Sequence, residues 1–178
     1  MTDFEPDSGK ILDAEFFYSR LLQTLRTRLE SAPDVQAQVG MIGIYSGGAW
    51  IAERLHVDLQ LQQPLGMLDS ALYRDDLNER GLRAEMQAAH IPFEVAGRHI
   101  ILVDDVLYTG RTVRGALNEL FDFGRPARVE LAVLVDRGGR ELPVNAQYVG
   151  ETLALWPNQT LVLEQYEDKR FVLSLENQ

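Results

Sequence analysis

The sequence predicts an α/β protein with a mainly parallel, twisted sheet flanked by helices. Two apolar runs of strand length lie at 41–45 and 100–103, and a third, nearly all apolar, lies at 129–135. Such runs, without polar alternation, are typical of strands that are covered on both faces in a parallel sheet. Between the second and third runs, apolar residues recur at helical spacing up to Gly124, which predicts a strand, helix and strand crossover. A chain of 178 residues has the usual size of one such domain, so we expect a single domain over 1–178.

The remaining elements follow from periodicity and from turn residues. The expected elements are a helix at 11–29, a strand at 41–45, a turn at 46–48, a helix at 49–55, a strand at 66–73 and short strands at 148–149, 161–163 and 171–175. The charged, aperiodic stretch from about 74 to 90 predicts a long flexible loop. Loops of that length inside compact domains are uncommon, and they are often lids or binding loops.

The charge balance and the missing residue types exclude several classes of function. The chain carries 17 Lys plus Arg against 27 Asp plus Glu, which gives a net charge of −10. Such a protein repels polyanions, so we expect no DNA partner.

The absence of cysteine excludes disulfides and thiolate chemistry and favours a reducing compartment. No apolar run approaches the roughly 20 residues that span a bilayer, and the acidic N-terminus lacks a basic, apolar leader. We therefore expect a cytoplasmic protein that does not contact membranes.

The segment 104–112 has the composition of a phosphate-binding turn. In open α/β sheets, ligands lie outside the carboxyl ends of the strands, and this segment directly follows the apolar run at 100–103. Backbone N–H groups at the start of the next helix, together with the hydroxyls of Thr109 and Thr112, can cradle a phosphate. Gly110 permits the close approach of the backbone that such a cradle requires.

Asp104 and Asp105 stand at the end of the same strand. Adjacent carboxylates can accept hydrogen bonds from sugar hydroxyls and can hold a water-bound Mg²⁺. The alternative is that the two acids cap the following helix while Thr109 and Gly110 form a turn. The Walker pattern and the G-x-G-x-x-G fingerprint are both absent from the sequence, which argues against nucleoside triphosphatases and dinucleotide-binding proteins.

Three blocks of sequence carry a resemblance to a known family. The order at 103–112, an apolar strand, two acids and then x-Thr-Gly-x-Thr, resembles the motif with which type I phosphoribosyltransferases bind 5-phosphoribosyl 1-diphosphate (PRPP). The blocks at 72–77, 103–114 and 134–143 together resemble the PyrR family of pyrimidine operon regulators and uracil phosphoribosyltransferases, and the likeness covers most of 39–152. It implies the single-domain type I phosphoribosyltransferase fold, with a flexible loop or hood beside the sheet.

The resemblance implies an enzyme, a pentosyltransferase that converts uracil and PRPP to UMP and diphosphate with Mg²⁺ as its cofactor. It also implies a regulator of pyrimidine gene expression that responds to UMP, a homo-oligomer of two or more subunits, and RNA as a further partner. The alternative is a catalytically weak nucleotide sensor that keeps the PRPP and UMP site and binds RNA or a protein partner.

The family's functional residues match four segments of this chain. By resemblance, the ribose and the metal belong to Asp104 and Asp105, the 5-phosphate to Tyr108, Thr109, Gly110, Arg111 and Thr112, the diphosphate to Ser46, Gly47 and Gly48, and the base to backbone groups of Asp136, Arg137 and Gly138. For Asp136 and Arg137 the alternative is a surface ion pair. Arg74, in the expected loop, is a candidate catalytic residue if loop closure brings its charge to the site, and the alternative is a solvated side chain.

Three departures from the family's pattern bear on these assignments. Tyr108 stands where purine-specific relatives carry an Asp, so we expect uracil and not purines to be used. The turn 46–48 reads Ser-Gly-Gly where many relatives have Thr-Arg-Gly, and the lost cation favours the nucleotide-sensor alternative. Gly139 and Asn145 replace a His and an Arg of RNA-binding relatives. With the net charge of −10, this predicts weak and strongly salt-dependent RNA binding.

Overall fold

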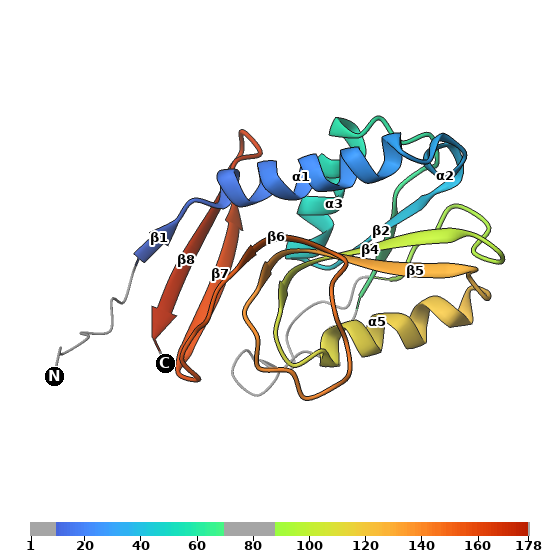
Figure 1. The fold of residues 1–178 in the computed structure, drawn as a ribbon. Coiled ribbons are helices and arrows are strands. Elements are labelled where there is room, and N and C mark those ends of the chain that lie inside the picture. The colour runs from blue at the N-terminus through green and yellow to red at the C-terminus, as the bar shows by residue number, and fades with distance from the viewer. Residues whose placement is uncertain (1–9, 70–87, 178) are drawn as a thin grey trace, which may run out of the picture.

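The computed structural model describes residues 10–69 and 88–177. Its elements, in chain order, are β1 (Lys10–Leu12), α1 (Ala14–Glu30), α2 (Pro33–Gln38), β2 (Gly40–Ile44), α3 (Gly47–Asp58), β3 (Gly66–Leu68), β4 (His99–Leu107), α5 (Arg111–Asp122), β5 (Arg128–Asp136), β6 (Tyr148–Thr152), β7 (Gln159–Gln165) and β8 (Phe171–Asn177). Five strands form a parallel sheet in the order β3-β2-β4-β5-β6. A smaller antiparallel sheet, in the order β1-β8-β7, lies beside the N-terminal end of α1 (Figure 1).

Helices cover both faces of the parallel sheet. α1 and α3 lie on one face and α5 lies on the other (Figure 1). Successive side chains of a strand point to opposite faces. In β4, Ile101 and Val103 accordingly pack into the cluster that contains α1 and α3. Ile100 and Leu102 pack with α5 instead. This confirms the prediction of strands covered on both faces. Within the two described ranges, no helix has the length and apolar character of a membrane span.

The first helix begins later than the sequence predicts. α1 begins at Ala14 because Asp13 caps it, and the Asp13 side chain accepts a hydrogen bond from the backbone N–H of Phe16 at 2.9 Å. The preceding residues pair with β8 as an edge strand. There Leu12 packs against the core while Ile11 is 72% exposed, which is the alternation of a strand and not the spacing of a helix.

Two elements near the expected site have bounds that differ from the prediction. β4 extends to Leu107 and therefore contains Asp104 and Asp105, which the sequence pattern put after the strand. Pairing with β5 continues past the acids, and this pairing keeps the backbone extended. α3 begins at Gly47, so the glycines of the predicted turn belong to its first turn.

Part of the predicted strand and most of the predicted loop lie outside the described residues. β3 ends at Leu68, whereas the sequence predicts a strand over 66–73. Residues 70–73 of that strand and 74–87 of the loop, with Arg74, are not described. At the end of the predicted loop, His90 exchanges two backbone hydrogen bonds with Met67, at 2.8 and 2.9 Å.

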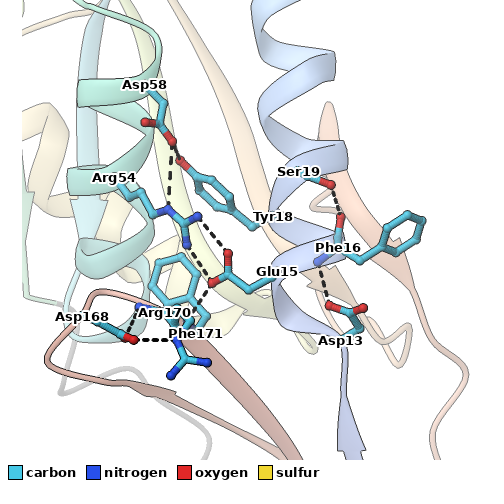
Figure 2. Close-up of polar contacts among 10 residues, drawn as sticks. All are labelled: Asp13, Glu15, Phe16, Tyr18, Ser19, Arg54, Asp58, Asp168, Arg170 and Phe171. Atoms are coloured by element: carbon cyan, nitrogen blue, oxygen red, sulfur yellow. Dashed lines mark hydrogen bonds and ion pairs between the residues drawn. The ribbon is translucent and has the colours of Figure 1, made fainter.

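A cluster of charged and aromatic side chains joins α1, α3 and β8 (Figure 2). Arg54 of α3 donates two hydrogen bonds to Glu15 of α1, at 2.7 and 2.8 Å. Its guanidinium lies 4.1 Å from the centre of the Tyr18 ring, and Tyr18 donates a hydrogen bond to Asp58 at 2.6 Å. Glu15 also accepts a hydrogen bond from the backbone N–H of Phe171 at 2.8 Å. The small sheet is thereby fixed to the helical layer of the large one.

Candidate functional site

Asp104 and Asp105 lie near the carboxyl end of β4. Asp104 is 5% exposed, and its Oδ1 accepts a hydrogen bond from the backbone N–H of Asp105 at 3.0 Å. Asp105 Oδ1 accepts a hydrogen bond from the backbone N–H of Val106 at 2.9 Å. The N-cap of α5 is Gly110, which provides no side-chain cap. Neither acid therefore occupies the N-cap position of this helix.

The start of α3 packs directly against the acid pair. A Cβ atom on Gly47 would overlap Oδ2 of Asp105 and lie 2.7 Å from Asp105 Cγ. On Gly48, a Cβ atom would lie 2.8 Å from Asp104 Cα. At position 48 only glycine leaves room for this approach of backbone to backbone. Two segments that the family resemblance assigned to one substrate thus lie in contact.

The turn after β4 and the start of α5 form the segment that was predicted to bind a phosphate. Thr109 is 4% exposed, and its hydroxyl accepts a hydrogen bond from the backbone N–H of Arg111 at 3.2 Å. The Arg111 side chain donates to Glu141 Oε2 from Nε at 2.9 Å and from Nη2 at 2.6 Å. Thr112 follows in the first turn of α5. The predicted residues are contiguous here, and Arg111 has a carboxylate partner that the sequence pattern did not indicate.

In the loop after β5, polar groups form hydrogen bonds within the protein that were not predicted. Asp136 Oδ1 accepts a hydrogen bond from the backbone N–H of Gly138 at 2.9 Å, and Asp136 Oδ2 accepts from Arg140 Nη2 at 2.5 Å. The backbone N–H of Arg137 donates to Leu107 O at 3.0 Å. The alternative of an Asp136 and Arg137 ion pair is therefore wrong, because Asp136 pairs with Arg140. Of the backbone groups expected to face a base, the N–H groups of Arg137 and Gly138 are engaged within the protein.

Arg137 is buried, with 8% of its surface exposed. Its guanidinium lies 4.0 Å from the centre of the Tyr108 ring, and Nη2 donates to Trp156 O at 3.3 Å. Burial lowers the pKa of Arg137, and the neighbouring Tyr108 partly offsets this effect. A contact between Tyr108 and Arg137 thus joins the predicted phosphate segment to the predicted base segment.

Arg140 is a structural residue of the site that the sequence pattern did not single out. It donates to Tyr108 O at 2.8 Å, to Val144 O at 2.9 Å and to the carboxylate of Asp136. These bonds tie the loop after β5 to the turn after β4. The only sequence signal was its position four residues after Asp136, which is too common to be specific.

Four of the predicted segments therefore meet at the carboxyl ends of β2, β4 and β5, whereas Arg74 lies outside the described residues. Among residues 10–69 and 88–177, no group of three or more His, Asp or Glu side chains is arranged to hold a metal ion. An ion held by Asp104 and Asp105 could complete its coordination with oxygen atoms of water or of a bound molecule.

Comparison with known proteins is consistent with this arrangement. The model of the phosphoribosyl transferase domain family matches residues 22–167. The bifunctional protein PyrR of Ralstonia nicotianae is 54% identical, over 86% of this chain and 87% of its own length. The protein of the same name from Nitrosococcus oceani is 51% identical, over 85% of this chain and 86% of its own length.

Solved structures show the same fold at low sequence identity. A hypoxanthine phosphoribosyltransferase from Staphylococcus aureus is 18% identical, with a TM-score of 0.65 over 96% of this chain and 94% of its own. A hypoxanthine phosphoribosyltransferase from Trypanosoma cruzi is 18% identical, with a TM-score of 0.66 over 96% of this chain and 95% of its own. These similarities confirm the predicted type I phosphoribosyltransferase fold. By its domain match and by its identity to these relatives over most of its length, this chain belongs to the phosphoribosyltransferase family and, within it, to the PyrR proteins.

Proposed function

We propose that this protein transfers a phosphoribosyl group from PRPP to uracil, which yields UMP and diphosphate, and that UMP is also its regulatory ligand. The observation that carries the proposal is the packing of the glycine turn of α3 against the carboxylate of Asp105. This packing places two features in one site: a backbone turn suited to binding diphosphate and an acid pair suited to binding ribose. The name shared by the relatives and the matched domain support the same function.

In this proposal Asp104 and Asp105 bind the ribose hydroxyls and Mg²⁺. In phosphate chemistry Mg²⁺ is commonly held by one or two carboxylates plus substrate oxygens, and it keeps several waters. Two adjacent acids, without a third protein ligand grouped with them in the described part of the chain, fit such a site. When bound, the ion would neutralise charge on the diphosphate. The chain's own contribution is to hold the acids rigid through the pairing of β4 with β5.

The reaction requires mainly positioning and electrostatic stabilisation from the protein. Uracil N1 gives up its proton to solvent and forms a bond to the anomeric carbon of PRPP as the bond from that carbon to diphosphate breaks, and the ribose acquires positive charge in the transition state. Backbone N–H groups of 46–48, at the start of α3, would stabilise the leaving diphosphate. The segment 108–112 would hold the 5-phosphate at the other end of the substrate. The acid pair between these two anchors would orient the ribose for attack.

The first test is to incubate the protein with uracil, PRPP and Mg²⁺. We expect UMP and diphosphate in equal amounts, and no nucleotide from hypoxanthine or guanine. The double variant Asp104→Asn with Asp105→Asn should lose transfer while its circular dichroism and its Tm stay near those of the wild type. Loss of the folded state would show that the acids are structural. Purine nucleotides formed at a comparable rate would contradict the role given to Tyr108.

A nucleotide sensor with weak turnover is the second candidate function. It is favoured by the turn 46–48, which has no cationic side chain for the diphosphate. Under this alternative, UMP binds but forms slowly from uracil and PRPP. Calorimetric titration with UMP, run beside the transfer assay, separates the two functions.

Self-association into a homo-oligomer of two or more subunits is also part of the proposal. Phe121 and Phe123, at the end of α5, are 54% and 42% exposed, and they provide apolar surface for such a contact. Sedimentation of the purified protein tests this directly, and a monomer at assay concentrations would contradict it.

A further inference from the structure

Three successive carbonyl oxygens, at the end of β4 and in the turn that follows it, accept hydrogen bonds from the loop after β5. The pairs are Leu107 O with the backbone N–H of Arg137 at 3.0 Å, Tyr108 O with Arg140 Nη1 at 2.8 Å, and Thr109 O with the backbone N–H groups of Glu141 and Leu142 at 3.0 and 3.1 Å. The loop after β5 thus holds three consecutive peptide units by their oxygen atoms.

These bonds also fix the direction of the N–H groups in the same peptide units. The three peptide bonds are trans, and the C=O and N–H of a planar trans peptide point in opposite directions. Because the oxygens are held toward the loop after β5, the N–H groups of Tyr108, Thr109 and Gly110 point away from that loop. Gly110 has φ of +93°, and a left-handed residue in such a turn is typical of backbone nests that bind anions.

Arg140 connects the turn to the loop through its whole guanidinium group. Besides Tyr108 O, it binds Val144 O through Nε at 2.9 Å and Asp136 Oδ2 through Nη2 at 2.5 Å. Each of its three side-chain nitrogens is thereby bonded within the protein, and the carboxylate of Asp136 balances its charge. Val144 in turn packs against Gly110, where a Cβ atom would lie 3.2 Å from Val144 Cβ. This arrangement suits support of the turn and not direct contact with a ligand.

We infer that Arg140 is a positioning residue for phosphoribosyl transfer: by holding Tyr108 O, it aims the N–H groups of the turn at the 5-phosphate of PRPP and UMP. This inference rests on the proposed function, which places the 5-phosphate at 108–112, and deepens it. The oxygens of Leu107 and Thr109 are held by backbone donors, which most substitutions would keep. The middle peptide unit is held by a side chain, so its orientation depends on residue 140.

Arginine has the geometry that this role requires. Its planar guanidinium donates hydrogen bonds in several fixed directions at once, whereas the lysine ammonium is a compact charge on a flexible stem. Only a fork of donors can bind Tyr108 O, Val144 O and the Asp136 carboxylate together. The role therefore depends on the shape of the Arg140 side chain as well as on its charge.

Ribose 5-phosphate and diphosphate probe the two ends of the proposed PRPP site separately. In calorimetric titrations with Mg²⁺, we expect Arg140→Met to bind ribose 5-phosphate about tenfold or more weakly than the wild type, as for a lost hydrogen bond to a charged group. Diphosphate affinity should be unchanged, because the turn 46–48 that would bind it belongs to the start of α3. Arg125→Met, at an exposed arginine before β5, is the matched control and should bind both ligands as the wild type does.

The variant Arg140→Lys separates positioning from charge. It keeps the charge but lacks the fork, so we expect it to lose most of the ribose 5-phosphate affinity that Arg140→Met loses. Wild-type affinity in Arg140→Lys would overturn the inference, because charge alone would then be sufficient. Undiminished ribose 5-phosphate binding by Arg140→Met would overturn it as well. So would equal losses of ribose 5-phosphate and diphosphate in Arg140→Met, because they would indicate a general effect on the site.

A measurement on the wild type keeps the inference testable if the Arg140 variants do not fold. In nuclear magnetic resonance spectra, saturating ribose 5-phosphate should move the amide protons of Tyr108, Thr109 and Gly110 downfield, as expected for charge-assisted hydrogen bonds to phosphate. The Arg140 Nε proton should stay protected from solvent exchange in the complex. Unmoved amides in a complex that other resonances report, or loss of this protection, would overturn the inference. A wild type that binds neither ribose 5-phosphate nor diphosphate would overturn the proposed function itself.

Discussion

At the residue scale, position 47 offers the sharpest test of the site. A methyl group there would overlap Asp105 Oδ2, so Gly47→Ala must displace either the carboxylate or the start of α3. A displacement of about 1 Å in an active site can cost roughly 100-fold in rate. We expect kcat/KM for PRPP to fall by about that factor, with the Tm within a few degrees of the wild type. Initial-rate assays with varied PRPP check this, and an unchanged kcat/KM would mean that Asp105 is not used in the reaction.

The sequence identifies the residues of the site that belong to one segment, and it fails where separate segments meet. Asp104, Asp105 and the following turn could be predicted because the strand, the acids and the start of the helix are consecutive. The stack of Arg137 on Tyr108 and the bonds of Arg140 to that turn join two loops, and neither periodicity nor spacing carries information about such contacts. The pairing of Asp136 with Arg140, four residues further along the chain, was not predicted for the same reason.

At the element scale, the central strands were predicted because burial on both faces leaves a continuous apolar run. α2 was not, because none of its residues is buried and a short exposed helix has no apolar period. The sequence pattern also predicted that β4 ends before the two acids, although pairing with β5 extends the strand beyond them. Polar residues inside a strand are a common sign of a functional site, and here sequence and fold disagree at the residues proposed to bind substrate.

The junction of α1, α3 and β8 should be sensitive to acid. Hydrogen bonds from Arg54 lower the pKa of Glu15 from its ordinary value of 4.5, burial opposes this, and the backbone N–H of Phe171 lowers it further. A carboxyl with a lowered folded-state pKa stabilises the fold above its unfolded pKa, and this stability is lost as pH falls through the folded pKa. The wild type should lose stability as the pH falls from about 6 to about 3. We expect this loss to be smaller in Glu15→Gln, by roughly 1 kcal/mol or less because Glu15 is partly exposed.

Urea unfolding at several pH values measures this effect of Glu15. The matched control is Glu164→Gln, an exposed acid on β7, which should keep the pH dependence of the wild type. If Glu15→Gln shows the same loss of stability in acid as the wild type, the Arg54 pairing does not contribute to folding.

At the scale of the whole molecule, the two sheets share one apolar core. Leu163, Phe171 and Leu173 of the small sheet pack in the same cluster as Leu21 of α1 and Leu134 of the large sheet. We therefore expect residues 1–178 to unfold as a single domain. Far-ultraviolet circular dichroism and tryptophan fluorescence should give coincident urea transitions. Two separate transitions would mean that the small sheet is an independent unit.

Affinity for RNA is also a property of the whole molecule, because phosphate contacts depend on the net charge and on unpaired cations. The net charge is −10, and several exposed arginines are paired with carboxylates of this chain: Arg20 with Glu151, Arg111 with Glu141, Arg128 with Glu130 and Arg170 with Asp168. Before such an arginine can contact a phosphate, its ion pair must be broken, or its guanidinium must bind the carboxylate and the phosphate together. We therefore expect a Kd of roughly 10⁻⁴ to 10⁻⁶ M at physiological salt, the range of non-specific binding, with a steep loss as salt rises. Filter binding with the leader RNA of the organism's own pyrimidine genes, with and without UMP, measures it. A nanomolar Kd that depends on UMP would show instead that a local surface overcomes the acidic balance and that the regulatory function includes RNA.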